Sequence, residues 1–151
     1  MLLAFLIISV IMSLLFKNIK MVIISLIPNI IPLIIAGGIM GYFNIPLKPS
    51  SALVFSIVFG ISVDYSIHFL AKFKNELLNK NLEDSIIETI NQTGRSMIFT
   101  SFILFFGFII FAFSNFGGTI ILGVLTSVIL FVAMITNLTL LPSIILYFYK
   151  K

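Results

Sequence analysis

Long apolar runs, interrupted by short polar or charged stretches, dominate the pattern along this chain. A membrane-spanning helix needs roughly 20 mostly apolar residues. Five stretches are candidates, of which the second contains Pro28 and Pro32 and the third contains Asp64. The predicted spans cover residues of about 2–16, 21–43, 51–71, 97–114 and 119–148. We therefore expect an all-α integral membrane protein whose residues 1–151 form a single transmembrane domain.

The polar stretch between the third and fourth spans has a helical pattern of its own. Asn81 is a favourable N-cap, acids follow it in the first turn, and Gly94 can end the helix. Ile86 and Ile90 recur at helical spacing. This pattern predicts a short cytoplasmic amphipathic helix over about 82–93. It either lies on the inner membrane surface or docks on the loops of its own bundle.

Composition supports the membrane assignment. The chain is 60% hydrophobic and 9% charged, whereas soluble domains average about 45–50% apolar and about 25% charged residues. Without cysteine and with one histidine, the chain offers little material for a disulfide or a metal site, and we expect neither. The formal charge of +4 does not suggest nucleic acid in so apolar a chain, because basic residues there set membrane topology.

The basic residues indicate how the spans are oriented. With five spans, eight of the nine basic residues fall on one side of the membrane, and Lys48 lies on the other. The positive-inside rule then places the C-terminus in the cytoplasm and the N-terminus outside. We expect a multi-pass protein of the cytoplasmic (inner) membrane.

Asp64 is the leading candidate for chemistry. An aspartate in mid-membrane costs about 2.5–3.5 kcal/mol on insertion scales, and such residues mark ion or proton pathways. Because burial disfavours the carboxylate, Asp64 can hold a proton near neutral pH and is a candidate proton carrier. The alternative is a purely structural Asp, bonded to a neighbouring helix to fix the packing.

Several neighbours share the face of Asp64 or lie next to it. Ser56 and Gly60 lie on the same helical face, where small residues allow another helix to approach closely. His68 is on that face too, either as a proton relay or as an interfacial histidine bonded to water. Tyr65 offers a hydroxyl that either bonds an acid on a facing helix or simply packs.

Other polar residues and the enzyme classes change the picture little. In the fifth span Asn137 is the strongest candidate for functional polar lining, beside threonines that bond backbone in many membrane helices. One His excludes H-E-x-x-H zinc proteases, and Asp64 lacks the second membrane aspartate of an aspartyl protease. Ser66 and His68 point to different faces, and no Gly-rich phosphate loop occurs. We expect neither an enzyme nor a bound cofactor.

Four stretches together resemble one family of transporters. "GISVDYSIHFLAKFKNEL" is similar to the Asp-bearing helix of resistance–nodulation–division (RND) exporters of the MMPL type. "LIPNIIPLIIAGGIMGYFNIPL", "ETINQTGRSMIFTSFILFFGFIIFAFSNF" and "GVLTSVILFVAMITNLTLLPSIILYF" resemble, in order, the preceding helix, the T-G-R segment with its helix, and the last helix. The ordered set covers nearly the whole chain.

The resemblance implies a function. These exporters are driven by protons, without a cofactor, and move hydrophobic or lipid-like substrates. Asp and Tyr residues from two halves form a relay in the membrane. Asp64 and Tyr65 match those positions, which implies that Asp64 carries the proton and Tyr65 bonds the partner half's Asp.

The resemblance also implies that something is missing. A full exporter has two halves with external porter domains, and this chain has one five-helix block. We therefore expect a fragment or split half that pairs with another RND half or with itself in the bilayer. The alternative is a lipid-binding or regulatory module like the related sterol-sensing domain, in which Asp64 only organises the bundle.

Overall fold

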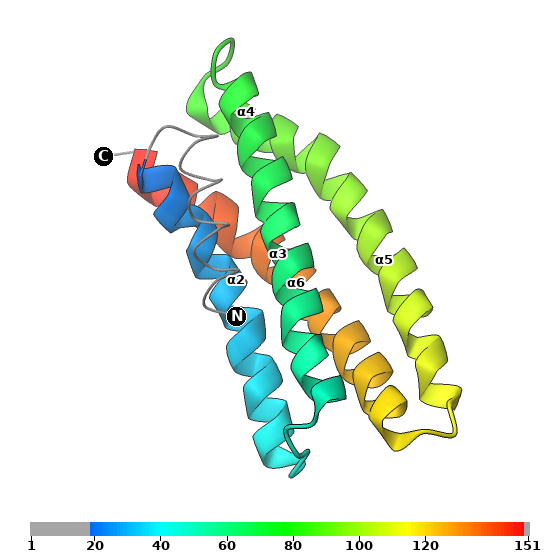
Figure 1. Ribbon diagram of the computed structural model, residues 1–151. Coiled ribbons are helices and arrows are strands. Elements are labelled where there is room, and N and C mark those ends of the chain that lie inside the picture. Colours follow the sequence, from blue (N-terminus) through cyan, green and yellow to red (C-terminus); the bar gives the residue numbers. More distant parts are fainter. Residues whose placement is uncertain (1–18, 150–151) are drawn as a thin grey trace.

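The chain forms an up-and-down bundle of long helices (Figure 1). The structure is a computed structural model that describes residues 19–149, and all regular elements in that range are helical. In chain order they are α2 (Ile19–Tyr42), α3 (Pro49–Glu76), α4 (Leu82–Thr89), the π-helical turn η1 (Ile90–Gly94), α5 (Arg95–Ile109), the 3₁₀ turn η2 (Ile110–Phe113) and α6 (Gly117–Tyr149). The predicted first span, 2–16, lies outside the described residues.

Helical stretches suited to a membrane dominate this part of the chain. By length and composition, those at Ile24–Tyr42, Pro49–Glu76, Leu82–Phe113 and Gly117–Tyr149 could each cross a bilayer. They correspond to the second through fifth predicted spans. The α2–α3 and α5–α6 connections lie at one end of the bundle. The α3–α4 connection and the end of α6 lie at the other (Figure 1).

Local chemistry explains the tight turn between α2 and α3. Asn44 has a left-handed backbone with φ of 51°, a conformation common just past the end of a helix. The amide of Ile45 then donates back to the carbonyl of Met40 at 2.8 Å. Pro49 begins α3, where the missing N–H of proline has no cost. The Ser51 hydroxyl accepts a hydrogen bond from the backbone amide of Lys48 at 2.9 Å. The turn is therefore held by hydrogen bonds at both of its ends.

The predicted break at Gly94 is wrong. Gly94 has ordinary right-handed helical backbone angles, and the chain continues without interruption from α4 through η1 into α5. Helical hydrogen bonding is kept by the wider π turn, so the glycine changes the helix locally instead of ending it. The loop between the third and fourth spans is correspondingly short, from 77 to 81.

α4 docks on its own bundle. It packs on α3 and α6, and its inward side buries Ser85, Ile86 and Thr89. Of the two alternatives for this helix, these contacts favour docking. Asn81 is the N-cap residue as expected, but its side chain makes no capping bond. Its carbonyl instead accepts the hydroxyl of Ser85 at 2.7 Å.

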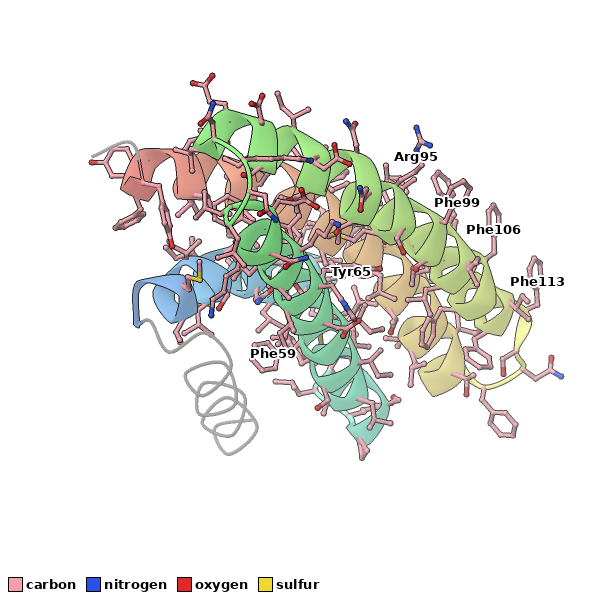
Figure 2. The ribbon with its side chains drawn as sticks, turned by 90° about the horizontal axis from the view of Figure 1, so that it is seen from above. Phe59, Tyr65, Arg95, Phe99, Phe106 and Phe113 are labelled. Carbon is pink, nitrogen blue, oxygen red and sulfur yellow. The ribbon has the colours of Figure 1, made fainter. Side chains whose placement is uncertain are left out.

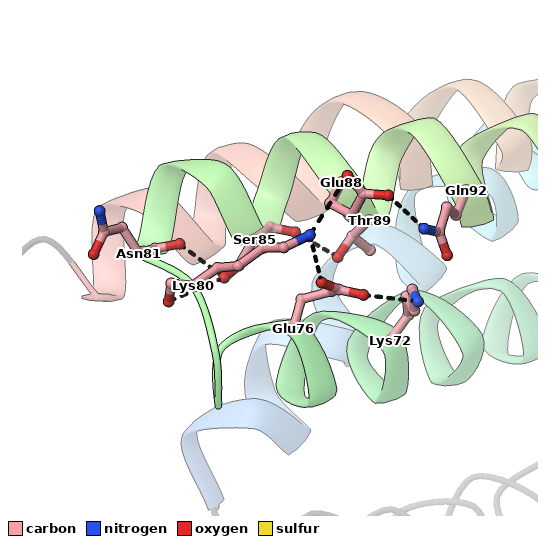
Figure 3. A network of polar contacts seen from close by, with 8 residues as sticks. All are labelled: Lys72, Glu76, Lys80, Asn81, Ser85, Glu88, Thr89 and Gln92. Atoms are coloured by element: carbon pink, nitrogen blue, oxygen red, sulfur yellow. Dashed lines mark hydrogen bonds and ion pairs between the residues drawn. The ribbon is translucent and has the colours of Figure 1, made fainter.

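A chain of ion pairs fastens the α3–α4 loop (Figure 3). Oε1 of Glu76 lies 2.8 Å from Nζ of Lys72, and Oε2 of Glu76 lies 2.9 Å from Nζ of Lys80. Lys80 also approaches Glu88 of α4 at 3.5 Å, and Glu88 accepts the side-chain amide of Gln92. The last turn of α3 is thereby joined to α4 and η1.

Two apolar clusters form the core around α3 and α6. The cluster near the α3–α4 end contains Phe69, Phe73 and Leu141. The cluster near the α2–α3 turn contains Val54 and Val58. Both are completed by α2. By contrast α5 packs mainly on α6 and exposes most of its surface. The protein core is therefore a three-helix arrangement with α5 on its flank.

Candidate functional site

Asp64 and His68 form a polar pair on the surface of α3. Nε2 of His68 lies 3.3 Å from Oδ1 of Asp64, one helical turn away. The side chain of His68 is 70% exposed and that of Asp64 is 62% exposed. Asp64 sits in the middle of the helix, about 18 Å before its end at Glu76 at a rise of about 1.5 Å per residue. The structure therefore brings together two of the residues singled out from the sequence.

The pair lies at one end of a polar cleft between α3 and the η1–α5 segment. The cleft has a volume of about 670 Å³. It is lined by Asp64, Tyr65, His68, Ala71, Lys72, Asn75, Gln92, Thr93, Ser96, Met97 and Thr100. Most of these side chains are polar, and they follow both helices from mid-span to the α3–α4 loop. This arrangement can hold water beside a carboxyl group that lies deep in a predicted span.

Tyr65 lines the same cleft as Asp64 but points toward α5, into the bundle. Its hydroxyl lies 2.6 Å from the Ser101 hydroxyl of α5, and its side chain is buried (Figure 2). This contact joins α3 to the lightly packed α5 and fixes how the two helices are aligned. Ser101 was not singled out from the sequence, where an isolated serine in an apolar run carries little signal.

The face of α3 that carries Asp64 is open. Ser56 and Gly60 lie on it, both exposed, and a Cβ placed on Gly60 would meet nothing within 4 Å. No described helix of this chain therefore uses the small residues for close approach. The open strip and the carboxylate together form a surface that a second helix could cover.

A second polar group lies inside the bundle, opposite this face. Ser62 and Ser66, each two residues from Asp64, project to the other side of α3 and are fully buried. Ser62 donates to Oδ1 of Asn29 in α2 at 2.6 Å, and Ser66 donates to Oδ1 of Asn137 in α6 at 2.7 Å. Nδ2 of Asn137 donates to the Ser62 hydroxyl at 3.1 Å. We call Asn29, Ser62, Ser66 and Asn137 the central polar cluster.

The cluster sits between the two apolar cores and links α2, α3 and α6. It is anchored to the backbone, because Nδ2 of Asn29 donates to the carbonyl of Ser25 at 2.7 Å and Nδ2 of Asn137 to that of Ala133 at 3.0 Å. Cross-helix bonds on the buried side of α3 fix which side of the helix turns outward. The cluster therefore positions Asp64 at the open face without touching it.

Sequence reasoning found part of this cluster. Asn137 was the strongest polar candidate of the fifth span, and the structure places it with Ser62 and Ser66 on the buried side of α3. The two serines were missed, although their spacing of four residues on the side opposite Asp64 was a usable signal. Of the threonines in α6, Thr136 and Thr139 bond their own helix backbone, and the buried Thr126 hydroxyl has no hydrogen-bond partner within residues 19–149.

Comparison with known proteins identifies the family. The sequence matches the pattern that defines the MMPL family over residues 1–150. The chain belongs to the MMPL family. It is also 31% identical over 124 residues to MJ1562 of Methanocaldococcus jannaschii, a protein named as a membrane protein. That match covers 82% of this chain and 32% of the relative, so the chain spans about a third of that protein's length.

Family and structure agree on the coarse description. This MMPL chain is a multi-pass membrane protein whose described part is built of helices, as the resemblance to RND exporters of the MMPL type implies. Its polar pair, cleft and central cluster are features of the membrane domain itself.

Proposed function

We propose that this chain is the membrane block of a proton-driven RND/MMPL-type exporter of hydrophobic or lipid-like substrates. Asp64 takes up and releases the proton, and the proton-motive force supplies the energy without a bound cofactor or an enzymatic step. The proposal rests chiefly on the exposed Asp64 carboxylate, which lies in mid-span against His68 and beside a polar cleft.

Electrostatics supports an active role for this carboxylate. An ionised aspartate facing lipid at mid-membrane costs about 2.5–3.5 kcal/mol, yet the open face of α3 presents Asp64 outward. Contact with His68, whose Nε2 lies 3.3 Å from Oδ1 of Asp64, places beside the carboxylate a ring that can pass a proton to it. A structural aspartate would instead be expected inside the central polar cluster, where asparagine and serine already satisfy one another.

The cleft supports a route for the proton. It follows α3 from Asp64 past His68 to Lys72 and Asn75, toward the end that carries most of the basic residues. On the topology proposed here, with that end in the cytoplasm, water in the cleft connects Asp64 to the cytoplasmic side. Asp64 would then exchange protons by way of His68 and water.

The open face supports a partner. Ser56, Gly60 and Asp64 form a strip with small residues on one side of the carboxylate, and close helix packing in membranes favours small residues. We propose that another RND half, or a second copy of this chain, covers the strip. Covering removes the carboxylate from lipid and completes the relay, in which Tyr65 would exchange its bond to Ser101 for one to the partner half's Asp.

Transport in the complete exporter system tests the proposal. Asp64→Asn keeps the size of the side chain and removes its titration, so proton-coupled export should be lost while the protein is still made and inserted. Asp84→Asn, an exposed acid in the first turn of α4, is the matched control and should transport normally. Wild-type export by Asp64→Asn would exclude Asp64 as the proton carrier.

A lipid-binding or regulatory module like the sterol-sensing domain is the second candidate. An apolar groove of about 440 Å³ favours it, lying between the end of α2 and the start of α6 and lined by residues such as Phe43, Ile120 and Val124. In this case Asp64→Asn would leave lipid binding unchanged, whereas Val124→Asp in the groove would abolish it. Loss of proton-coupled export in Asp64→Asn would instead favour the exporter.

A further inference from the structure

We infer that Arg95, Asn91 and the hollow beside them form a binding site for an anionic phospholipid, with the lipid phosphate on Arg95. The hollow has a volume of about 270 Å³ and lies between η1, the start of α5, and α6. It is lined by Ile90, Asn91, Gly94, Arg95, Ile98 and Leu138. This site is separate from the Asp64 cleft and does not depend on the proposed transport function.

The lining has a polar part and an apolar part, which match the phosphate headgroup and the acyl chains of a phospholipid. Asn91 and Arg95 lie one helical turn apart and supply an amide and a guanidinium, both good partners for a phosphodiester. The remaining side chains, Ile90, Ile98 and Leu138, are apolar and suit the start of an acyl chain. Gly94 makes room for this arrangement, because a Cβ there would meet Cδ2 of Leu138 at 3.0 Å.

Arg95 is free to bind an anion. Among the side chains that the structure describes, Lys72 and Lys80 are paired with acids near the α3–α4 loop. Arg95 forms no ion pair with any described acid and is exposed. Its guanidinium therefore keeps a full positive charge that nothing in the described bundle neutralises.

The depth of Arg95 matches that of a lipid headgroup. The bond between Tyr65 and Ser101 aligns α3 with α5, and the two helices run in opposite directions (Figure 1). Arg95 precedes Ser101 by about 9 Å of helix, and Lys72 follows Tyr65 by about 10 Å at a rise of about 1.5 Å per residue. Arg95 therefore lies level with Lys72, where the apolar part of α3 ends.

The side chains beyond Arg95 continue the apolar part of the site. Figure 2 shows Arg95, Phe99, Phe106 and Phe113 in one row along the outer side of the helix, pointing away from the other helices. Phe99, Phe106 and Phe113 are each more than half exposed. A lipid whose phosphate meets Arg95 can lay an acyl chain along this row. The charge and the apolar row together favour a membrane lipid over a soluble phosphate.

Native mass spectrometry of the purified chain in detergent tests the site. Phosphatidylglycerol and phosphatidylcholine are added at equal concentrations. The wild type should retain phosphatidylglycerol about fivefold better, the factor implied by one cation near an anionic headgroup. Arg95→Gln should remove most of that preference, and Arg95→Lys should restore much of it. Lys74→Gln, an exposed cation on the same side of the membrane, should leave the preference unchanged.

Three results would overturn the inference. Equal retention of both lipids by the wild type would remove the anionic specificity. Equal losses in Arg95→Gln and Lys74→Gln would indicate diffuse surface charge instead of a site. Displacement of the bound lipid by glycerol 3-phosphate alone would indicate a soluble phosphate ligand. Unchanged circular dichroism and gel-filtration behaviour of Arg95→Gln would show that any loss of binding is not a loss of fold.

Discussion

Asn137→Ala tests whether the central polar cluster stabilises the packing of α2, α3 and α6. The substitution removes the acceptor of Ser66 at 2.7 Å and the donor to Ser62 at 3.1 Å. Side-chain hydrogen bonds between membrane helices are worth about 0.6 kcal/mol on average and at most about 1.7. These two shorter cross-helix bonds account for about 1.2 kcal/mol of the free energy of unfolding, and the longer contact from Nδ2 of Asn137 to Oδ1 of Asn29 at 3.4 Å is lost with them.

Lost packing adds to this cost. Asn137 is fully buried, and alanine leaves a small void whose lining loses its dispersion contacts, at about 1 kcal/mol for so small a truncation. Ser66 can recover part of the loss, because Oδ1 of Asn29 lies within 3.2 Å of its hydroxyl. The expected destabilisation is about 2 kcal/mol, from bonds and packing in similar shares.

Reversible unfolding in sodium dodecyl sulfate, followed by circular dichroism, measures this quantity. Thr139→Ala is the matched control, because Thr139 is exposed and bonds the carbonyl of Ile135 in its own helix at 2.8 Å. It should cost less than about 0.5 kcal/mol. An Asn137→Ala cost as small as the control's would refute the reasoning. So would strict additivity with Ser66→Ala, since residues that share a bond should couple.

Two further predictions follow from the packing of α6 and from the α3–α4 loop. Gly123→Ala should destabilise the bundle by about 1–3 kcal/mol, because its Cβ would lie 2.6 Å from the carbonyl oxygen of Phe108. Gly37→Ala, with open space around it, should not lower the thermal transition in detergent, and equal effects would contradict this. The hydrogen bond and charge of Glu76 raise the pKa of Lys80. Their contact is thus present from the acid range in which Glu76 ionises up to about pH 10.4, and it is lost as pH rises through the raised pKa of Lys80. Protection of the loop amides, which is the factor by which they exchange more slowly than an unstructured peptide at the same pH, should be lower at neutral pH in Glu76→Gln than in the wild type. Equal protection in both proteins would contradict the ion-pair account.

The sequence pattern predicted the long helices well, because apolar length is a direct requirement of the bilayer. The predicted end at about 43 and start at about 51 lie within two residues of the observed ends at Tyr42 and Pro49, since a tight turn with Asn and Pro leaves the backbone few alternatives. Gly94 misled the prediction. Glycine ends many helices through a left-handed conformation, but here the π turn and contact with Leu138 keep it right-handed.

The candidate site could be predicted only as separate residues. The helical spacing of Asp64 and His68 was enough to bring them together. The partners of Tyr65 and Asn137 depend on how α3 is rotated against α5 and α6, and one sequence does not fix that rotation. Serines such as Ser62 and Ser66 bond backbone in many membrane helices, so their cross-helix role appears only when three helices are placed together.

The protonation of Asp64 is the most direct measure of the central claim. Infrared difference spectra of the reconstituted protein, compared with those of Asp64→Asn, isolate its carboxyl band and can follow it between about pH 5 and pH 9. The account predicts a band that titrates near neutral pH. A carboxyl that stays in one state across this range, both alone and with a partner half present, would contradict it.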